Sequence, residues 1–197
     1  APGLGLIPGA GPNNVDSDTT IPKLEVSYTY NGGNFSLTPM VGYQTYKYVT
    51  LNALGTEQDD NITSWLAALG WKTNFGPFYF NGSIQYGQNT GNYVMTFEQG
   101  SNRAAWNNTT NEIIDNNTWG FAAVVGWKLN DMFTFEGGYG QINHELDATV
   151  TNFGVTKTDP EDSRQNWYVQ ARITVSPGFM VIPEVGMLYY DENEITP

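Results

Sequence analysis

Apolar residues return at every second position through long stretches of this chain, and Trp65 to Gly87 shows the pattern most clearly. From Trp65 to Trp71 they alternate with smaller or polar residues, and after TNFGP the alternation resumes at Phe78. Period-two alternation on either side of a turn signal is typical of paired β-strands. The stretch therefore predicts a β-hairpin with one apolar, aromatic face and one small or polar face.

The same plan recurs along the chain. WGFAAVVGWKLNDMFTFEGGYGQIN, residues 119–143, repeats the first hairpin closely. A second type occurs twice, as LEVSYTYNGGNFSLTPMVGY from Leu24 and WYVQARITVSPGFMVIPEVGM from Trp167, each with Pro-x-Val-Gly in its returning strand, at Pro39 and Pro183. These repeats predict eight strands in four hairpins.

The connections alternate in length. Four are tight turns, centred on residues 31–33, 74–76, 129–131 and 176–178, and three are long, at about 49–62, 88–118 and 143–165. Short turns at one end and long loops at the other are typical of an antiparallel, up-and-down transmembrane β-barrel.

A soluble β-sandwich would also show alternating apolar and polar residues, but the spacing of the aromatic residues favours a membrane barrel. Trp119 and Trp127 share a face, and ~3.3 Å per residue with a tilt near 40° separates them by roughly 20 Å along a barrel axis. The central apolar face carries no charged residue. We expect lipid-interface positions at Trp65, Trp71, Trp119, Trp127 and Trp167.

Composition narrows the function. The chain has no Cys, 14% charged residues and a net charge of −12, with only eight Lys and Arg, so disulfides, thiolate metal sites and nucleic-acid binding are disfavoured. His144 is the only His, which leaves no basis for a catalytic triad, and we expect no enzyme activity.

The first and last predicted strands both meet the long-loop side, which suggests further strands at each end. We therefore expect residues 1–22 to be an extracellular loop segment, 23–190 to be part of a single barrel domain, and 191–197 to begin another extracellular loop. The whole barrel is expected to have 16 to 18 strands, roughly the size of a porin.

GPFYFNGSIQYGQNTGNY, FEGGYGQINHE and VIPEVGMLYYDE resemble segments of the general porins of sulfate-reducing and related proteobacteria. The resemblance implies a homotrimer in the bacterial outer membrane, in contact with lipid and lipopolysaccharide. It also implies passive diffusion of small hydrophilic solutes through a water-filled lumen.

A porin lumen selects by its width and by the charges that line it. The inward faces predict a mildly cation-selective pore lined by Glu25, Lys72, Gln85, Lys128, Glu136, Gln170, Arg172 and Glu184. We expect Gln170 opposite Glu184, and Val124 opposite Glu136. Glu136 and Arg172 are expected to form a lumen pair, either for selectivity or as a structural ion pair, and Lys72 and Lys128 could instead be solvated rim residues.

The connection at 88–118 is the best candidate for a loop that folds inward and narrows the lumen, with Phe97, Glu98, Arg103 and Trp106 as constriction residues. The alternative is a loop that packs over the mouth or against a neighbouring subunit. Acidic loop clusters make Asp59, Asp60, Asp159 and Asp162 candidate Ca²⁺ ligands, against the alternative of solvated loops. No other cofactor is expected.

Three further functions remain open. They are a non-conducting outer-membrane anchor or adhesin barrel, a substrate-specific channel with a ladder of lumen arginines, and a soluble β-sandwich binding module. Against the substrate-specific channel, only Arg172 is expected on a strand.

Overall fold

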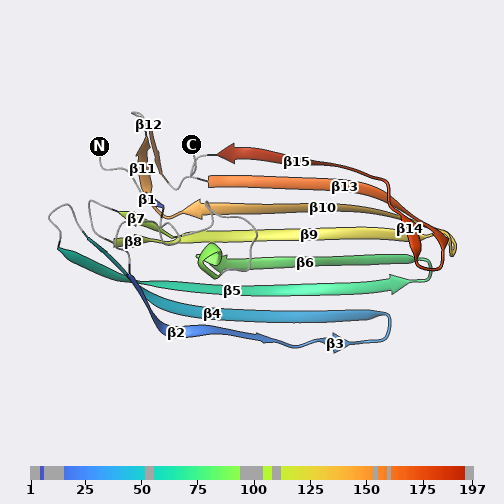
Figure 1. Ribbon diagram of the computed structural model, residues 1–197, viewed down its shortest axis with the longest axis horizontal. Helices are drawn as coiled ribbons and strands as arrows, with labels where there is room; N and C mark the ends of the chain where they lie inside the picture. The colour runs from blue at the N-terminus through green and yellow to red at the C-terminus, as the bar shows by residue number, and fades with distance from the viewer. Residues whose placement is uncertain are drawn as a thin grey trace.

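The structure is a computed structural model, and it describes residues 5–6, 16–51, 56–93, 104–107, 112–152, 155–158 and 161–193. One antiparallel sheet dominates it (Figure 1). Its long strands, in spatial order, are β2 (Asp16–Ser27), β4 (Phe35–Leu51), β5 (Glu57–Phe75), β6 (Phe78–Gln88), β9 (Asn116–Lys128), β10 (Phe133–Leu146), β13 (Glu161–Ser176) and β15 (Glu184–Asn193). Two short strands, β3 (Tyr30–Asn31) and β14 (Phe179–Val181), lie in line with β2 and β15.

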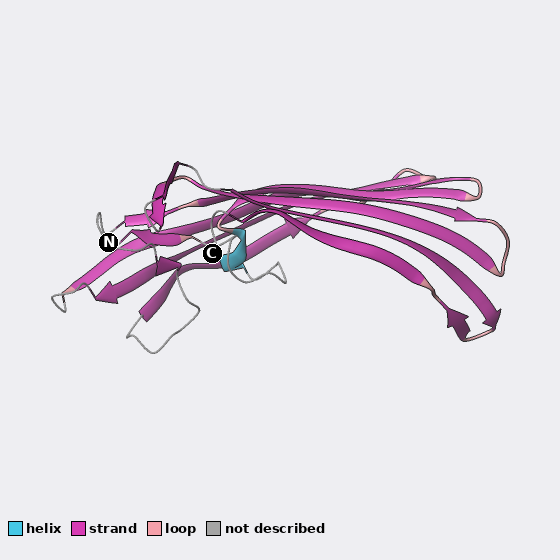
Figure 2. Ribbon diagram, turned by 90° about the horizontal axis from the view of Figure 1, so that it is seen from above, coloured by secondary structure: helices cyan, strands magenta, loops and turns pink. Residues whose placement is uncertain are grey.

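Each long strand pairs with the next long strand along the chain, so the predicted up-and-down antiparallel order is confirmed. The sheet is not closed, since β2 and β15 form its edges within the described residues. Figure 1 places the tight turns at one end and the long connections at the other. Figure 2 shows that the sheet bends and twists along its length.

Glycines permit three of the tight turns. Gly33, Gly76 and Gly178 have φ of 75°, 60° and 83°, in the left-handed region that residues with a Cβ rarely adopt. The turn between β9 and β10 is different, because the Asn130 side-chain oxygen accepts hydrogen bonds from the Met132 and Phe133 amides. A side chain thus holds this turn together.

That turn overturns one predicted register. Glu136 pairs with Gly126, whereas Val124 pairs with Gly138. The prediction of Val124 opposite Glu136 was wrong because it placed the turn at residues 129–131. In the structure the turn extends to Phe133, whose backbone hydrogen-bonds with Asn130. The other predicted pair, Gln170 with Glu184, is confirmed.

The strands run further toward the long connections than the alternation of apolar residues suggests. β2 begins at Asp16 rather than Leu24, and pairing of β4 with β5 continues to Leu51 and Glu57. Beyond β10, a hairpin of β11 (Thr149–Asn152) and β12 (Val155–Thr158) occupies part of the expected loop. Backbone pairing needs no apolar side chains, so polar strand ends escape a search for apolar alternation.

The cross-strand registers give the sheet two faces. The aromatic face carries the five predicted tryptophans, Trp65, Trp71, Trp119, Trp127 and Trp167. The polar face carries every residue predicted to line a pore: Glu25, Lys72, Gln85, Lys128, Glu136, Gln170, Arg172 and Glu184.

Small elements between β6 and β9 pack on the polar face. They are the 3-10 helix η1 (Thr90–Tyr93) and the strands β7 (Ala105–Asn107) and β8 (Glu112–Ile114), and β7 also pairs with β1 (Gly5–Leu6). We call the described parts of this segment, residues 89–93, 104–107 and 112–115, the strap.

Two small apolar clusters join the strap to the sheet. Ala104 packs with Tyr48 and Ile62. Ala105 and Ile114 pack with Leu146. Since Tyr48 and Ile62 belong to β4 and β5 and Leu146 belongs to β10, the strap crosses much of the width of the polar face at its long-loop end.

Candidate functional site

The aromatic face presents large apolar side chains to its surroundings. Ile84, Val125 and Val169, in the middle of the sheet, are 52%, 55% and 55% exposed. A contiguous exposed apolar surface of this kind marks a site of contact with protein or membrane. The aromatic face is therefore expected to contact a membrane or another protein surface.

Some aromatic rings on this face touch along diagonals, whereas Trp127 contacts its direct cross-strand partners Phe78 and Phe135. Trp65 contacts Tyr86 with ring centroids 5.5 Å apart, and Phe121 contacts Tyr139 at 5.6 Å. In each pair the second ring lies two register pairs nearer the tight turns and one strand nearer β13. Trp71 and Phe80, at 6.1 Å, repeat the same displacement closer to the tight turns.

These diagonals define a slope across the sheet. Following the register from Trp167 on β13 through Tyr139, Ala123 and Gly82 leads to Trp71 on β5, six residues beyond Trp65. Six residues span about 20 Å at ~3.3 Å per residue, and four interstrand steps of ~4.8 Å span about 19 Å. A line of aromatics from Trp65 to Trp167 thus crosses the strands at a slope of about 45°, within the tilt range of barrel strands.

A carboxylate forms the centre of the polar face near the tight turns. Glu136 accepts hydrogen bonds from the Tyr79 hydroxyl, from the Tyr168 hydroxyl at 2.8 Å and from the Gln170 amide at 2.5 Å. These three donors come from β6 and β13, on either side of β10. The contacts tie three strands together around one negative charge. The side chain of Gln170 also places this group beside Glu184, its cross-strand partner on β15.

Glycines make room for the two tyrosines. A Cβ on Gly126 would overlap the Tyr79 ring, and a Cβ on Gly138 would overlap the Tyr168 ring. Each ring therefore lies flat along the sheet over a residue without a side chain. This arrangement brings both hydroxyls to Glu136 from opposite sides.

Arg172 lies next to this group on the same face. It pairs with Thr134, two register pairs nearer the tight turns than Gln170 and Glu136. Among the described residues no ion pair within 4.0 Å joins Arg172 to Glu136, but its charge acts on Glu136 and on Tyr79. Glu136 and Arg172 therefore lie on the same face without the predicted ion pair, and the close contacts of Glu136 are with Tyr79, Tyr168 and Gln170.

The remaining predicted lysines and Glu25 lie toward the ends of the strands or the edge of the sheet. Lys128 forms an ion pair with Asp131 at 2.9 Å, and both are exposed. Lys23 and Glu25 pair at 3.2 Å on the edge strand β2. Lys72 is exposed near the tight turns. Exposed pairs of this kind contribute little to stability.

Asn89 joins the two ends of the strap. It is fully buried with φ of 52°, and its backbone N–H donates to the Asn116 carbonyl at 2.8 Å. Its side-chain oxygen accepts from the Asn116 N–H at 2.9 Å, and its side-chain nitrogen donates to the Thr63 carbonyl and to Asp115. A left-handed conformation is uncommon outside glycine, and asparagine is among the residues that tolerate it best.

A second contact holds the strap from the β5 side. Asp60, on the polar face, accepts a hydrogen bond from the backbone N–H of Ile113 at 3.1 Å. Together with Asn89 and the two apolar clusters, this bond fixes the strap at several points along its path.

Buried polar side chains lie at the base of the strap. Thr118 contacts Nδ1 of His144 at 3.0 Å, and it also lies within hydrogen-bond distance of Thr90 and Asn116. His144 is fully buried, one register pair beyond Trp119 on the long-loop side. Burial lowers the pKa of His144 to about 4, with a smaller contribution from the charge of Arg164. Its ring is therefore neutral at neutral pH.

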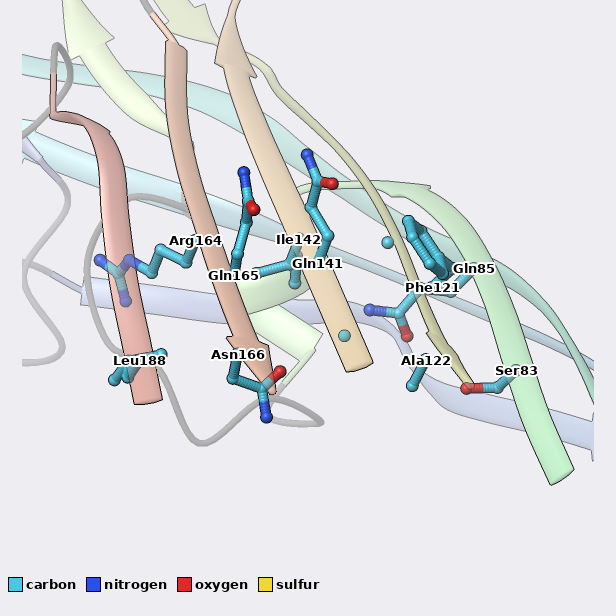
Figure 3. Close-up of a pocket in the computed structure, with 12 residues that line it drawn as sticks. Ser83, Gln85, Phe121, Ala122, Gln141, Ile142, Arg164, Gln165, Asn166 and Leu188 are labelled. Carbon is cyan, nitrogen blue, oxygen red and sulfur yellow. The ribbon is translucent and has the colours of Figure 1, made fainter. Parts of the chain in front are cut away.

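A hollow of ≈ 370 Å³ opens on the polar face between the strap and Glu136. Gly120, Gly140 and Ala122 form its low floor, and Ser83, Gln85, Ile142, Arg164, Asn166 and Leu188 surround it. Figure 3 shows Gln85 reaching from its strand toward the middle of this hollow. Phe121, Gln141 and Gln165 also border it, although their side chains belong to the opposite face.

Several predicted positions fall outside this description. Phe97, Glu98 and Arg103 lie outside the described residues, and of Trp106 only the backbone, in β7, is described. The structure therefore describes part of the connection at residues 88–118, but not the side chains predicted to constrict the lumen.

The candidate Ca²⁺ ligands do not meet at one place. Asp59 pairs with Lys47 at 2.8 Å on one face of β5, whereas Asp60 binds the strap on the other face. Asp162 is buried beside His144 on β13, and Asp159 lies outside the described residues. Within the described residues, no group of three or more His, Asp or Glu side chains is placed to hold a metal ion.

Sequence reasoning missed Tyr79, Tyr168, Asn89 and Thr118. Gly126 and Gly138 could have indicated the tyrosine positions, because a glycine inside a strand often marks the close approach of a neighbouring group. The role of Asn89 carried no local signal, since its partner lies at the far end of the long connection.

No family model, no curated protein and no solved structure matches the chain. The described part of the chain contains no helix long and apolar enough to cross a membrane.

Proposed function

We propose that this chain forms part of the wall of a bacterial outer-membrane β-barrel porin. Small hydrophilic solutes and ions diffuse passively through its water-filled lumen, with mild preference for cations. The polar face lines the lumen and the aromatic face meets lipid.

The slope of the aromatic rows carries this proposal. Two membrane interfaces are flat, so strands tilted by about 45° must place their interface aromatics at progressively shifted positions. The displacement from Trp65 to Trp167 has this size, and the contacts of Trp65 with Tyr86 and Phe121 with Tyr139 share its direction. The dry interior of a soluble sandwich has no such flat boundary to follow.

The polar face supports the conducting role. Its charges include Glu136, Glu184 and Arg172 at the level nearest the tight turns, and the strap lies across it at the other end. A segment held against the inside of a barrel narrows the water-filled space. The net charge of −12 favours cations near the mouth.

The resemblance of the sequence to general porins supports a homotrimer in contact with lipid and lipopolysaccharide. The open edges at β2 and β15 support a barrel that further strands complete, because an exposed edge strand is otherwise a site of aggregation.

The test is conductance of the full-length native protein in a planar lipid bilayer, with the reversal potential measured under a salt gradient. We expect stepwise openings and a reversal potential that shows cation preference. A folded, inserted protein that carries no current would refute the channel and favour a non-conducting anchor or adhesin barrel. A protein that stays monodisperse without detergent would refute the membrane location.

A further inference from the structure

We propose that the hollow between the strap and Glu136 is a binding subsite for a small, uncharged, polyhydroxylated solute such as a sugar. This inference rests on the proposed function and names a solute class for it.

The polar face has three successive levels. The strap and the buried polar residues around Thr118 form the first, and Glu136 with its tyrosines forms the third. The hollow lies between them, around Gly120 and Gly140. A solute that passes the strap from the long-loop side therefore meets the hollow next.

Amide groups lie against the floor of the hollow. The Asn166 side-chain oxygen is 2.7 Å from the place a Cβ would take on Gly140, and the Gln85 side-chain nitrogen is 3.4 Å from the corresponding place on Gly120. A side chain at residue 140 would displace the Asn166 amide, whereas a Cβ on Gly120 would first meet the Gln141 carbonyl oxygen at 3.0 Å. Gly140 thus keeps the Asn166 amide close to the wall, and the Gln85 amide lies within contact distance of Gly120.

The polar groups of the hollow are available to a ligand. Ser83, Gln85 and Asn166 form no side-chain hydrogen bond to any other described residue. An amide offers both donors and acceptors, and so does a hydroxyl. Sugar hydroxyls have the same dual character, so each can both donate to and accept from this set.

Charge selects against ionic ligands. No carboxylate is among the described residues that border the hollow, which leaves a cation without a counter-charge. Its one charged side chain, Arg164, extends toward β15 in Figure 3, with its guanidinium 5.2 Å from the centre of the Tyr190 ring. Anions also approach an acidic protein unfavourably.

Apolar surface completes the subsite. Ile142 and Leu188 border the hollow beside the amides. A sugar presents C–H groups as well as hydroxyls, and ligand sites commonly combine apolar walls with a few placed polar groups. The volume of ≈ 370 Å³ falls at the lower end of ligand pockets, which suits a small solute.

The experiment measures sucrose binding to the full-length channel in a planar bilayer. Sucrose entering the hollow interrupts the ion current, and the excess current noise gives its apparent dissociation constant. Gln85→Ala and Asn166→Ala should each weaken binding about fivefold, corresponding to the loss of one hydrogen bond. Asn81→Ala is the matched control, because Asn81 lies on β6 on the same face but does not border the hollow.

Equal binding by wild type and both hollow variants, or an equal loss in the Asn81 variant, overturns the subsite while leaving the channel intact. Equilibrium dialysis of detergent-solubilised protein with labelled sucrose separates the two proposals. Binding that depends on Gln85 and Asn166 in a protein without conductance supports the subsite and refutes the porin. Absence of binding in dialysis overturns the subsite.

Discussion

Asn89 and Asn116 hydrogen-bond to each other in both directions, with Asn89 N–H to the Asn116 carbonyl at 2.8 Å and Asn116 N–H to the Asn89 side-chain oxygen at 2.9 Å. The two residues stand where the strap leaves β6 and where it returns to β9. Their contact closes the connection at its base, where the strap leaves and rejoins the sheet.

Replacing Asn89 should release the strap. Asn89→Ala removes three side-chain hydrogen bonds and leaves a Cβ residue at φ 52°, for a combined cost of about 3 kcal/mol. Urea unfolding of the full-length protein in lipid vesicles measures this loss. Asn89→Gly also loses the bonds but relieves the backbone, so we expect it to be about 1 kcal/mol more stable than Asn89→Ala. Equal stability of these two variants would show that the backbone at residue 89 is not strained.

Neutralising Glu136 should weaken cation preference. A unit charge about 8 Å from a permeating ion favours a cation and disfavours an anion by ~0.5 kcal/mol each in water, so Glu136→Gln should lower the cation-to-anion permeability ratio by up to about sixfold. The reversal potential under a salt gradient reports the ratio. Glu161→Gln, an exposed charge at the long-loop end of β13, serves as control and should change it less. If the two variants give the same reversal potential, Glu136 does not contribute to ion selectivity in the lumen.

Gly126→Ala should narrow the lumen by pushing the Tyr79 ring off the wall. The added methyl group overlaps the ring, and overpacking of this kind costs about 1–3 kcal/mol. Single-channel conductance should fall, and adding Tyr79→Ala should restore it. Gly70→Ala is the matched control on the same face, because the nearest atom to its Cβ is 3.9 Å away. A conductance loss of equal size in Gly70→Ala would contradict this account.

His144 should make stability depend on pH between about 6.5 and 4. Because its pKa in the folded protein is lowered to about 4, the unfolded chain takes up a proton first as the pH falls. The neutral His144 ring contributes its full stabilisation above pH 6.5. By pH 4 the free energy of unfolding has fallen by about 3 kcal/mol because of this residue. Asp162, its cross-strand neighbour, and Arg164 are the nearby charges.

The comparison with His144→Gln isolates this effect, since other titrating groups are common to both proteins. The difference in unfolding free energy between wild type and His144→Gln should shift by this amount, against wild type, as the pH falls from 7 to 4. Parallel pH profiles would show that His144 titrates normally in the folded protein.

Neighbouring valines test the assignment of the two faces. Val125 is on the aromatic face and Val124 on the polar face. Arg on the lipid side near the membrane midplane costs about 2–4 kcal/mol, so Val125→Arg should reduce stability in vesicles by that amount. Val124→Arg should cost less because its charge remains in water. The opposite order would place the aromatic face away from lipid.

Alternation along the chain was enough to predict the strands, their order and their faces, because period two assigns each side chain a side. Trp119 to Trp127 and Gln170 opposite Glu184 belong to this class. The register at Glu136 was harder to predict from the sequence, since it depends on how Asn130 binds the Met132 and Phe133 amides. The register differs from the prediction by two residues, and a two-residue shift preserves both faces and leaves no trace in the alternation.

For the connection at residues 88–118, the sequence could suggest folding against the polar face only in general terms, without naming the contacts. Its excess of apolar residues was visible, but the partners Tyr48, Ile62 and Leu146 are distant in sequence. The group around Glu136 was equally hidden, because Tyr79 and Tyr168 approach it from two other strands.

Tyrosine rings that lie over glycines keep the polar face of the sheet low. At the level of Glu136, two of the bulkiest side chains fill space that Gly126 and Gly138 leave empty, and so add little height above the backbone. In the proposed porin, this arrangement would preserve the aqueous cross-section while holding a fixed negative charge near the tight turns. Substitutions that add a side chain at Gly126 or Gly138 would reduce that cross-section without changing any charge.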